Sequence, residues 1–292
     1  MNDMNKATLD YYVELIDNKL LELTHSKPEL QGQVVEAMEY SLQAGGKRLR
    51  PVLMLEFCRM CGERQPEKYA EIACSTFSLI HDDLPCMDDD DYRRGKPSCH
   101  KAFPENIALL AGDALNTLAF EVIANSAMNG VISADKAVML ISVLARAVGT
   151  DGMIGGQVID LKYENKEIDV DTLNILQTCK TGALIEAACV MGVILGDKLD
   201  AIPFAADYAQ AMGRAFQIVD DILDVTGTFE ELGKPIGSDS EQHKNTYVSL
   251  LGLDKSEQIA KQLTVQALGH LKYFEDSVFL TELTSDMLTR RS

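Results

Sequence analysis

The chain has 292 residues, of which 46% are hydrophobic, which is enough to bury a large core and excludes a disordered tail. Asp and Glu total 45 against 27 Lys and Arg, and the formal net charge of −18 disfavours a general nucleic-acid-binding surface. The positive charge that binds any anionic ligand must therefore come from a local cluster of basic residues. Basic residues do cluster, in "GGKRLRP" at 45–51 and "YRRGKP" at 92–97, beside the glycine and proline typical of shaped loops.

Helical periodicity runs along almost the whole chain. The first segment, "ATLDYYVELIDNKLLEL", spaces Leu9, Val13, Ile16 and Leu20 three and four residues apart, as an amphipathic helix does. Similar patterns predict helices at 32–43, 51–62, 67–83, 105–127, 134–149, 171–195, 201–225, 255–274 and 278–290. Strand alternation is almost absent, and no linker or internal repeat divides the chain. We therefore expect an all-α fold in which residues 1–292 form a single domain.

The cysteines and the N-terminus bear on the compartment. Seven cysteines is an odd number, most lie in apolar surroundings, and Cys58 and Cys61 lack the second pair that a zinc site needs. The N-terminal "MNDMNKATLD" has no signal pattern, and no apolar run approaches the ~18 residues of a membrane span. We expect buried free thiols, a reducing cytoplasm and no membrane span.

An unusual acidic stretch, "HDDLPCMDDDDYRR" at 81–94, places six carboxylates beside two arginines. Acids this close repel one another unless a cation lies between them, although many acidic runs are simply solvated loops. Asp82 and Asp88 are six residues apart, about 120° out of alignment on an ideal helix. Pro85 cannot continue a helix, so the chain is expected to leave after Asp83 and bring Asp88 back towards Asp82.

A second acidic group ends the segment "YAQAMGRAFQIVDDILDVTG", where Asp220 and Asp224 share a helical face. Each acidic group is followed by a Gly-Lys-Pro loop, "RGKP" or "LGKP", which suggests one shared site. Hard oxygen ligands without His or Cys at ligand spacing favour Mg²⁺, which binds carboxylates together with substrate phosphates. A diphosphate gripped by metal, Arg and Lys becomes a good leaving group, and the carbocation left behind needs a dry apolar pocket. This combination indicates ionisation of a prenyl diphosphate.

The motifs, taken in order, resemble those of the trans-isoprenyl diphosphate synthases. They are "GGKRLRP", "HDDLPCMDDDDYRRGKPSCH", "LLAGDAL", "GGQVIDL", "KTGALI", "AFQIVDDILDVTG", "LGKPIGSD" and "KNTYVSLLG", and the similarity runs from about residue 35 to 253. Two residues inserted in the first acidic motif make the chain most similar to bacterial farnesyl diphosphate synthase. The resemblance implies an all-α bundle around a central active-site cavity, usually a homodimer. It also implies condensation of isopentenyl diphosphate with dimethylallyl or geranyl diphosphate.

The resemblance also implies roles for individual residues. The Mg²⁺ ligands would be Asp82, Asp83, Asp88, Asp220 and Asp224, with three ions present when substrate is bound. The allylic diphosphate would be held by Arg93, Lys180 and Lys234, and isopentenyl diphosphate by Lys47, Arg50 and Arg94. Thr181 and Gln217 would steady the growing cation and the departing diphosphate, although a local helix hydrogen bond is the alternative for either residue.

Two features distinguish this chain from the family pattern. Ser75 occupies the position seven before Asp82 where a family His usually contacts isopentenyl diphosphate, and is expected to contact it there as a weaker donor. The interval from Lys47 to Asp82 is about one helical turn short. Phe77 lies five residues before Asp82, roughly 7.5 Å deeper along a helix, and is expected to form the floor that stops the product at C15. Farnesyl diphosphate is therefore the expected main product, with geranylgeranyl diphosphate as the alternative.

Other functions fit the sequence less well. A terpene cyclase would not need the second anion site, and a calcium-binding acidic protein would not need Arg93 or Lys234. A non-catalytic partner subunit stays open because of Ser75 and the short interval, although such subunits tend to have lost the acidic motifs that are intact here.

Overall fold

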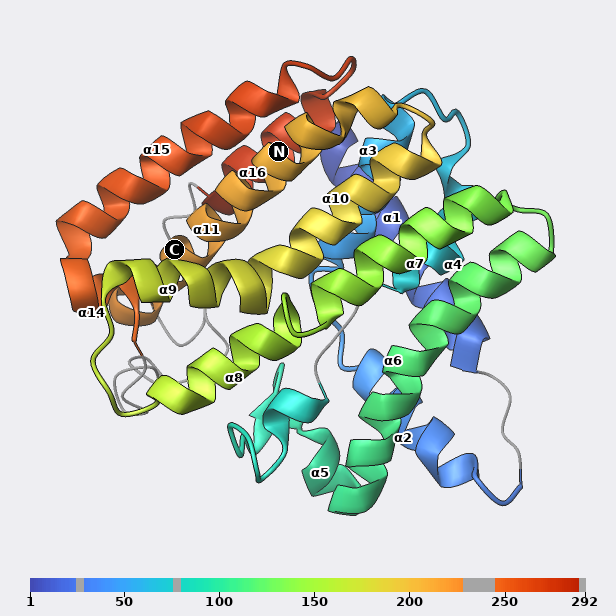
Figure 1. Cartoon of the computed structure of the whole chain (residues 1–292), viewed down its shortest axis with the longest axis horizontal. Helices are drawn as coiled ribbons and strands as arrows, with labels where there is room; N and C mark the ends of the chain where they lie inside the picture. Colours follow the sequence, from blue (N-terminus) through green and yellow to red (C-terminus); the bar gives the residue numbers. More distant parts are fainter. Residues whose placement is uncertain (25–28, 76–79, 228–244, 289–292) are drawn as a thin grey trace.

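The computed structural model describes residues 1–24, 29–75, 80–227 and 245–288, and nearly all regular structure within them is helical (Figure 1). The α-helices are α1 (Asp3–Thr24), α2 (Gly32–Leu42), α3 (Leu49–Met60), α4 (Ala70–Cys74), α5 (Cys99–Ala102), α6 (Glu105–Met128), α7 (Ala134–Val148), α8 (Met153–Tyr163), α9 (Val170–Gln177), α10 (Ala183–Leu195), α11 (Ile202–Thr226), α14 (Tyr247–Leu251), α15 (Leu253–Leu271) and α16 (Val278–Leu288). Short 3-10 turns lie at Pro66–Tyr69, His81–Asp83 and Leu199–Ala201. The predicted all-α fold is confirmed.

The core of the bundle is built around α10. Apart from Ala183 and Glu186, every residue of α10 is buried, because a helix that is apolar on all sides is stable only inside the protein. It packs against α3, α7 and α11, and Figure 1 shows it lying between α7 and α11. On its other side α11 packs along α15, so the helix that carries the second acidic group is held between two neighbours.

Among the longer helices α8 was not predicted, and the short helices α5 and α14 were not predicted either. Gly155 and Gly156 in "GGQVIDL" lower helix propensity, which is why the segment did not have the pattern of a helix. In the structure Gly156 serves close packing: a Cβ there would lie 2.3 Å from the backbone nitrogen of Lys180. The glycine thus lets α8 approach the chain around Lys180.

The helix predicted at 67–83 is wrong as a continuous element. The chain forms the 3-10 turn Pro66–Tyr69, the short helix α4 and the 3-10 turn His81–Asp83, and residues 76–79 lie outside the described residues. Another small difference is an antiparallel hairpin in "YRRGKP", with β1 (Tyr92–Arg93) pairing with β2 (Lys96–Pro97). The two elements are too short to give a strand pattern in the sequence.

The expectation that no segment is apolar enough to span a membrane is also wrong by length and composition. Three helical segments of the described chain meet that measure: Glu105–Met128, Ala134–Tyr163 and Val170–Leu195. Windows of this kind tolerate a few charged residues, so they do not appear as unbroken apolar runs.

On α8, Ile154, Val158 and Leu161 form an exposed apolar stripe. The expected homodimer stays a prediction, which the mass of the protein in solution tests.

Candidate active site

The loop "GGKRLRP" is shaped by its two glycines and fixed by an arginine. Gly45 and Gly46 have φ angles of +81° and +129°, which residues with a side chain rarely adopt. The guanidinium of Arg48 donates from Nε to Asp17 Oδ1 at 2.7 Å and from Nη2 to the Leu42 carbonyl oxygen at 2.6 Å. Arg48 therefore ties the loop to α1 and to the end of α2, a role that the sequence did not reveal.

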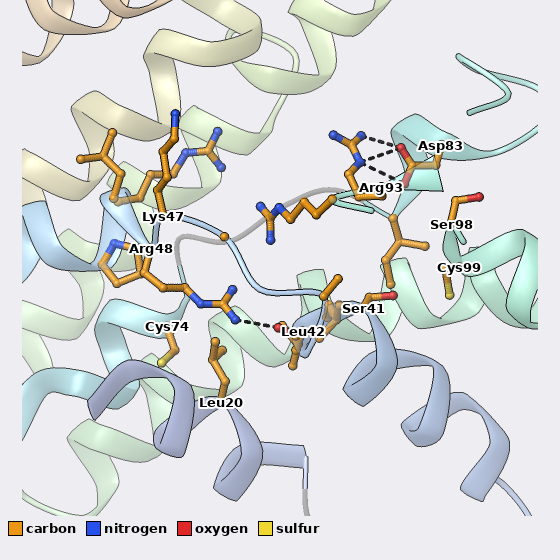
Figure 2. Close-up of a pocket in the computed structure, with 18 of the residues that line it drawn as sticks. Leu20, Ser41, Leu42, Lys47, Arg48, Cys74, Asp83, Arg93, Ser98 and Cys99 are labelled. Atoms are coloured by element: carbon orange, nitrogen blue, oxygen red, sulfur yellow. Dashed lines mark hydrogen bonds and ion pairs between the residues drawn. The ribbon is translucent and has the colours of Figure 1, made fainter. Parts of the chain in front are cut away.

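Two other basic residues of the same loop line a cavity. Lys47 extends from the loop in the opposite direction to Arg48 (Figure 2), and its Nζ lies 5.1 Å from the centre of the Phe216 ring. Burial lowers the pKa of Arg50 to about 10, against the opposing effect of the Asp82 carboxylate. Since this pKa is still well above 7, Arg50 stays positively charged at neutral pH. Both side chains are thus fixed cations at the cavity wall.

The hairpin supplies two further cations that point to different partners. Arg93 donates from Nε to both carboxylate oxygens of Asp83, at 2.9 and 3.1 Å, and from Nη2 at 2.5 Å (Figure 2). Arg94 donates to the Gly45 carbonyl oxygen and lies against Gly46, where a Cβ would be 2.5 Å from the guanidinium. Gly46 therefore allows the close approach of Arg94, and the two basic loops meet here.

In the first acidic motif the chain turns as predicted. Leu84 is extended before Pro85, and the Asp88 amide donates to the Asp82 carbonyl oxygen at 2.9 Å, so the loop does return. Asp83 is only 3% exposed and is fully engaged by Arg93. Its predicted role as a metal ligand is therefore better described as fixing Arg93, whereas Asp82 and Asp88 are partly exposed.

The second acidic motif separates into one cavity residue and two buried ones. Asp220 lines the same cavity as Asp83, so the structure brings the two motifs together as predicted. Asp221 and Asp224 are 3% and 2% exposed, and neither lines that cavity. The prediction that Asp224 contacts a metal is therefore not supported, because the helix turns its carboxylate into the protein.

The sequence around Lys180 forms a single π-helical turn, Thr178–Gly182, between α9 and α10. Such turns are rare and often occur at functional sites, and the 171–195 helix was predicted to be continuous. Lys180 Nζ contacts Asp160 Oδ2 of α8 at 2.6 Å. Burial alone would lower the pKa of Lys180, but the Asp160 carboxylate outweighs burial, with Asp88 and Asp82 adding to it, and the pKa is raised. Lys180 is thus a fixed cation close to the first acidic motif.

Asp160 was missed, although the motif that contains it, "GGQVIDL", was recognised. The carboxylate lies on α8, a helix that was itself not predicted. Only the packing of α8 on the π-helical turn shows that Asp160 and Lys180 are partners.

The cavity between these elements has a volume of about 740 Å³ (Figure 2). Its polar lining includes Lys47, Arg48, Arg50, Asp83, Arg93, Arg94, Thr181 and Asp220. Its apolar lining includes Leu49, Ile80, Leu115, Ile185 and Phe216. A concave site with cations and carboxylates on one part of its wall and aliphatic or aromatic side chains on another suits a molecule with an anionic head and a hydrocarbon tail.

The remaining predicted residues have different outcomes. Thr181 Oγ1 lies 3.5 Å from Gln217 Oε1, so Gln217 lies beside Thr181, which lines the cavity. Ser75 is 4% exposed, donates to the Ile72 carbonyl oxygen of its own helix at 2.6 Å, and does not line this cavity. The prediction that Ser75 contacts isopentenyl diphosphate is therefore not supported. Phe77 and Lys234 lie outside the described residues.

The acidic residues suit Mg²⁺ by the chemistry of their donors. No group of three or more His, Cys, Asp or Glu within the described ranges is arranged to hold a metal by itself. Mg²⁺ does not require such a group, because it usually takes one or two carboxylates and completes its shell with water and substrate phosphates. Asp82, Asp88 and Asp220 are partly exposed carboxylates. Asp220 lines the cationic cavity, Asp82 acts electrostatically on Arg50 at the cavity wall, and Asp82 and Asp88 both act on Lys180. They fit a metal that binds together with a diphosphate.

A helical bundle with this cavity belongs to the isoprenoid synthase class of folds. The family model for polyprenyl synthetase matches residues 31–279, and the chain belongs to that family. The family consists of Mg²⁺-dependent prenyltransferases, and prenyl transfer is the activity of its members. The predicted membership is confirmed.

Individual relatives agree with the family assignment. The chain is 43% identical over 266 residues to geranylgeranyl diphosphate synthase of Cyanophora paradoxa, covering 89% of this chain and 88% of that protein. It is 44% identical over 251 residues to the heterodimeric geranylgeranyl pyrophosphate synthase large subunit 1 of Arabidopsis thaliana, covering 83% and 68%.

Solved structures match over nearly the whole chain. A FPP/GFPP synthase from Zymomonas mobilis has a TM-score of 0.85 at 36% identity and covers 99% of this chain and 100% of its own. A geranyltransferase from Helicobacter pylori, complexed with magnesium and isoprenyl diphosphate, has a TM-score of 0.81 at 32% identity, with coverage of 99% and 97%.

Proposed function

We propose that the protein is a geranylgeranyl diphosphate synthase, which condenses isopentenyl diphosphate head-to-tail with allylic diphosphates up to a C20 product. The observation that carries the proposal is one cavity that joins two acidic motifs, two groups of cations and an apolar wall. Relatives that are 43% and 44% identical over most of the chain are named geranylgeranyl synthases, which favours C20 over the farnesyl product expected from the sequence. That expectation depended on Phe77, which lies outside the described residues.

The cations divide between two diphosphates. Arg93 and Lys180, on the side of the first acidic motif, hold the allylic diphosphate, together with Lys234 outside the described residues. Lys47, Arg50 and Arg94, which meet around the glycine loop, hold isopentenyl diphosphate. Two separate groups are needed because each substrate brings its own diphosphate to one cavity.

Bond breaking and bond making then follow from these positions. Asp82, Asp88 and Asp220 would hold about three Mg²⁺ ions, whose positive charge would neutralise the leaving diphosphate. The allylic carbon–oxygen bond breaks, and the double bond of isopentenyl diphosphate supplies the electron pair of the new carbon–carbon bond. The released diphosphate then takes a proton from the carbon next to the resulting cation, and the electrons of that carbon–hydrogen bond form the double bond of the product. The oxygens of Thr181 and Gln217 steady the cation. Side chains such as Ile185 and Leu115 exclude water.

A farnesyl diphosphate synthase is the second candidate, favoured by the Zymomonas mobilis structure named for FPP and GFPP synthesis. The experiment that separates the two supplies dimethylallyl, geranyl or farnesyl diphosphate in turn with isopentenyl diphosphate, and sizes the products. A C20 product from all three allylic substrates is expected. Accumulation of C15 with no use of farnesyl diphosphate would instead establish the farnesyl synthase. Absence of any product would contradict both.

Substitution of one cation from each group is expected to affect different substrates. Lys47→Ala should raise the KM for isopentenyl diphosphate about tenfold or more while changing that for the allylic substrate little, and Lys180→Ala should do the reverse. Steady-state kinetics with each substrate varied would measure this. Lys261→Ala, on the exposed face of α15, is the control and should change neither KM. Equal effects of Lys47→Ala on both substrates would contradict the division.

A further inference from the structure

A buried carboxylate lies directly behind the cavity wall and does not line it. Asp221 of α11 is 3% exposed, and both of its oxygens accept hydrogen bonds. Oδ1 accepts from Gln217 Nε2 at 3.2 Å, and Oδ2 accepts from the backbone nitrogen of Tyr247 at 2.8 Å. The second bond fixes the carboxylate against the first residue of α14, so Asp221 presents Oδ1 to Gln217 from an anchored position.

This contact decides which end of the Gln217 amide faces the site. An ionised carboxylate can only accept hydrogen bonds, so Gln217 must turn its NH₂ group towards Asp221. Its carbonyl oxygen is then the end that lies 3.5 Å from Thr181 Oγ1, at the cavity wall. Thr181 itself lines the cavity, whereas Gln217 and Asp221 lie behind it and do not.

The orientation matters because the two ends of an amide carry opposite partial charges. A carbonyl oxygen near the cavity stabilises a positive charge that develops in the substrate, whereas an NH₂ group in the same place would oppose it. We infer that Asp221 is a positioning residue: it acts through Gln217 by fixing the amide with its oxygen towards Thr181 and the cavity. The inference rests on the proposed prenyl transfer, in which a carbocation forms beside Thr181.

The decisive experiment exchanges the two members of the pair. Asp221→Asn keeps an acceptor for the Tyr247 amide but offers an NH₂ to Gln217, which then turns its own NH₂ towards Thr181. We expect kcat to fall about 100-fold, KM for both substrates to stay within about threefold, and the melting temperature to stay within about 3 °C. The double variant Asp221→Asn/Gln217→Glu restores an acceptor facing Thr181 and conserves the charge of the pair. The kcat of the double variant should be at least about tenfold higher than that of Asp221→Asn.

Controls separate the inference from simpler effects. Asp207→Asn, an exposed carboxylate on the same helix that lies 3.8 Å from His270, should leave kcat unchanged. Gln217→Met removes the amide and leaves the bond between Asp221 and Tyr247, so kcat should again fall about 100-fold. This variant tests the inference even if Asp221→Asn does not fold.

Each outcome bears on one claim. An inactive wild-type protein would overturn the proposed function, whereas the inference is tested only against an active one. With active wild type, full kcat in Gln217→Met or Asp221→Asn would overturn the inference. A loss of kcat in Asp221→Asn that the double variant does not recover would also overturn it, because Asp221 would then act through its charge and not through the orientation of Gln217.

Discussion

Asp82→Asn and Asp220→Asn are each expected to lower kcat by about a thousandfold or more, while the melting temperature stays within a few degrees. Asparagine keeps the size of the side chain but removes the negative charge that a divalent cation needs. Asp88 returns to Asp82 through the Pro85 turn, Asp82 acts electrostatically on Arg50 at the cavity wall, and Asp220 lines the cavity from α11. Because both are partly exposed, neither substitution leaves an uncompensated group in the core.

A carboxylate of the same acidic run provides the control for this prediction. Asp91 is exposed and pairs with Lys101 at 2.7 Å, away from the cavity lining. Asp91→Asn should therefore keep kcat within about threefold, since exposed ion pairs contribute little. Turnover would be measured at saturating substrate and Mg²⁺, with thermal unfolding followed by circular dichroism. Near-normal turnover in either Asp82→Asn or Asp220→Asn would show that the two motifs do not act on one diphosphate.

Gly156→Ala is expected to damage both stability and activity. A Cβ at this position would lie 2.3 Å from the Lys180 backbone nitrogen and 2.6 Å from its Cα, and a backbone contact of that kind cannot be relieved by a side-chain rotation. The helix α8 must therefore move away from the π-helical turn, at a cost of about 1–3 kcal/mol in the free energy of unfolding. Since Asp160 on α8 holds Lys180, we also expect kcat/KM to fall at least about tenfold.

The matched control is Gly269→Ala in α15. Nothing lies within 4 Å of a Cβ at Gly269, and the residue is exposed, so alanine there should stabilise the helix by about 0.5–1 kcal/mol and leave activity unchanged. Denaturant unfolding and steady-state kinetics of both variants measure the difference. If Gly156→Ala were as stable and active as Gly269→Ala, the close contact of α8 with Lys180 would not matter.

The parts of the site that the sequence predicted are those governed by local chemistry. Helical periodicity identified most helices because it depends on neighbours three and four residues apart. The return of Asp88 to Asp82 was predictable because proline ends a helix wherever it occurs. The glycine loop likewise needed only the conformational freedom of Gly45 and Gly46.

The parts that were missed depend on contacts between distant segments. The helix around Gly156 was not predicted, because nothing local distinguishes a glycine that permits packing from one that forms a turn. Asp83 could not be separated from Asp82 as a metal ligand until the hairpin placed Arg93 against it. In the same way, the burial of Asp224 and the inward hydroxyl of Ser75 follow from how α11 and α4 are seated in the bundle. Sequence spacing alone does not report any of these.

The central claim is tested most directly by incorporation of radiolabelled isopentenyl diphosphate, with geranyl diphosphate as the allylic substrate and Mg²⁺ present or removed by a chelator. We expect label to enter a C20 diphosphate when Mg²⁺ is present. When Mg²⁺ is removed, we expect no label to enter any condensation product. Failure of the folded protein to incorporate label with Mg²⁺, or equal incorporation after its removal, would contradict the account.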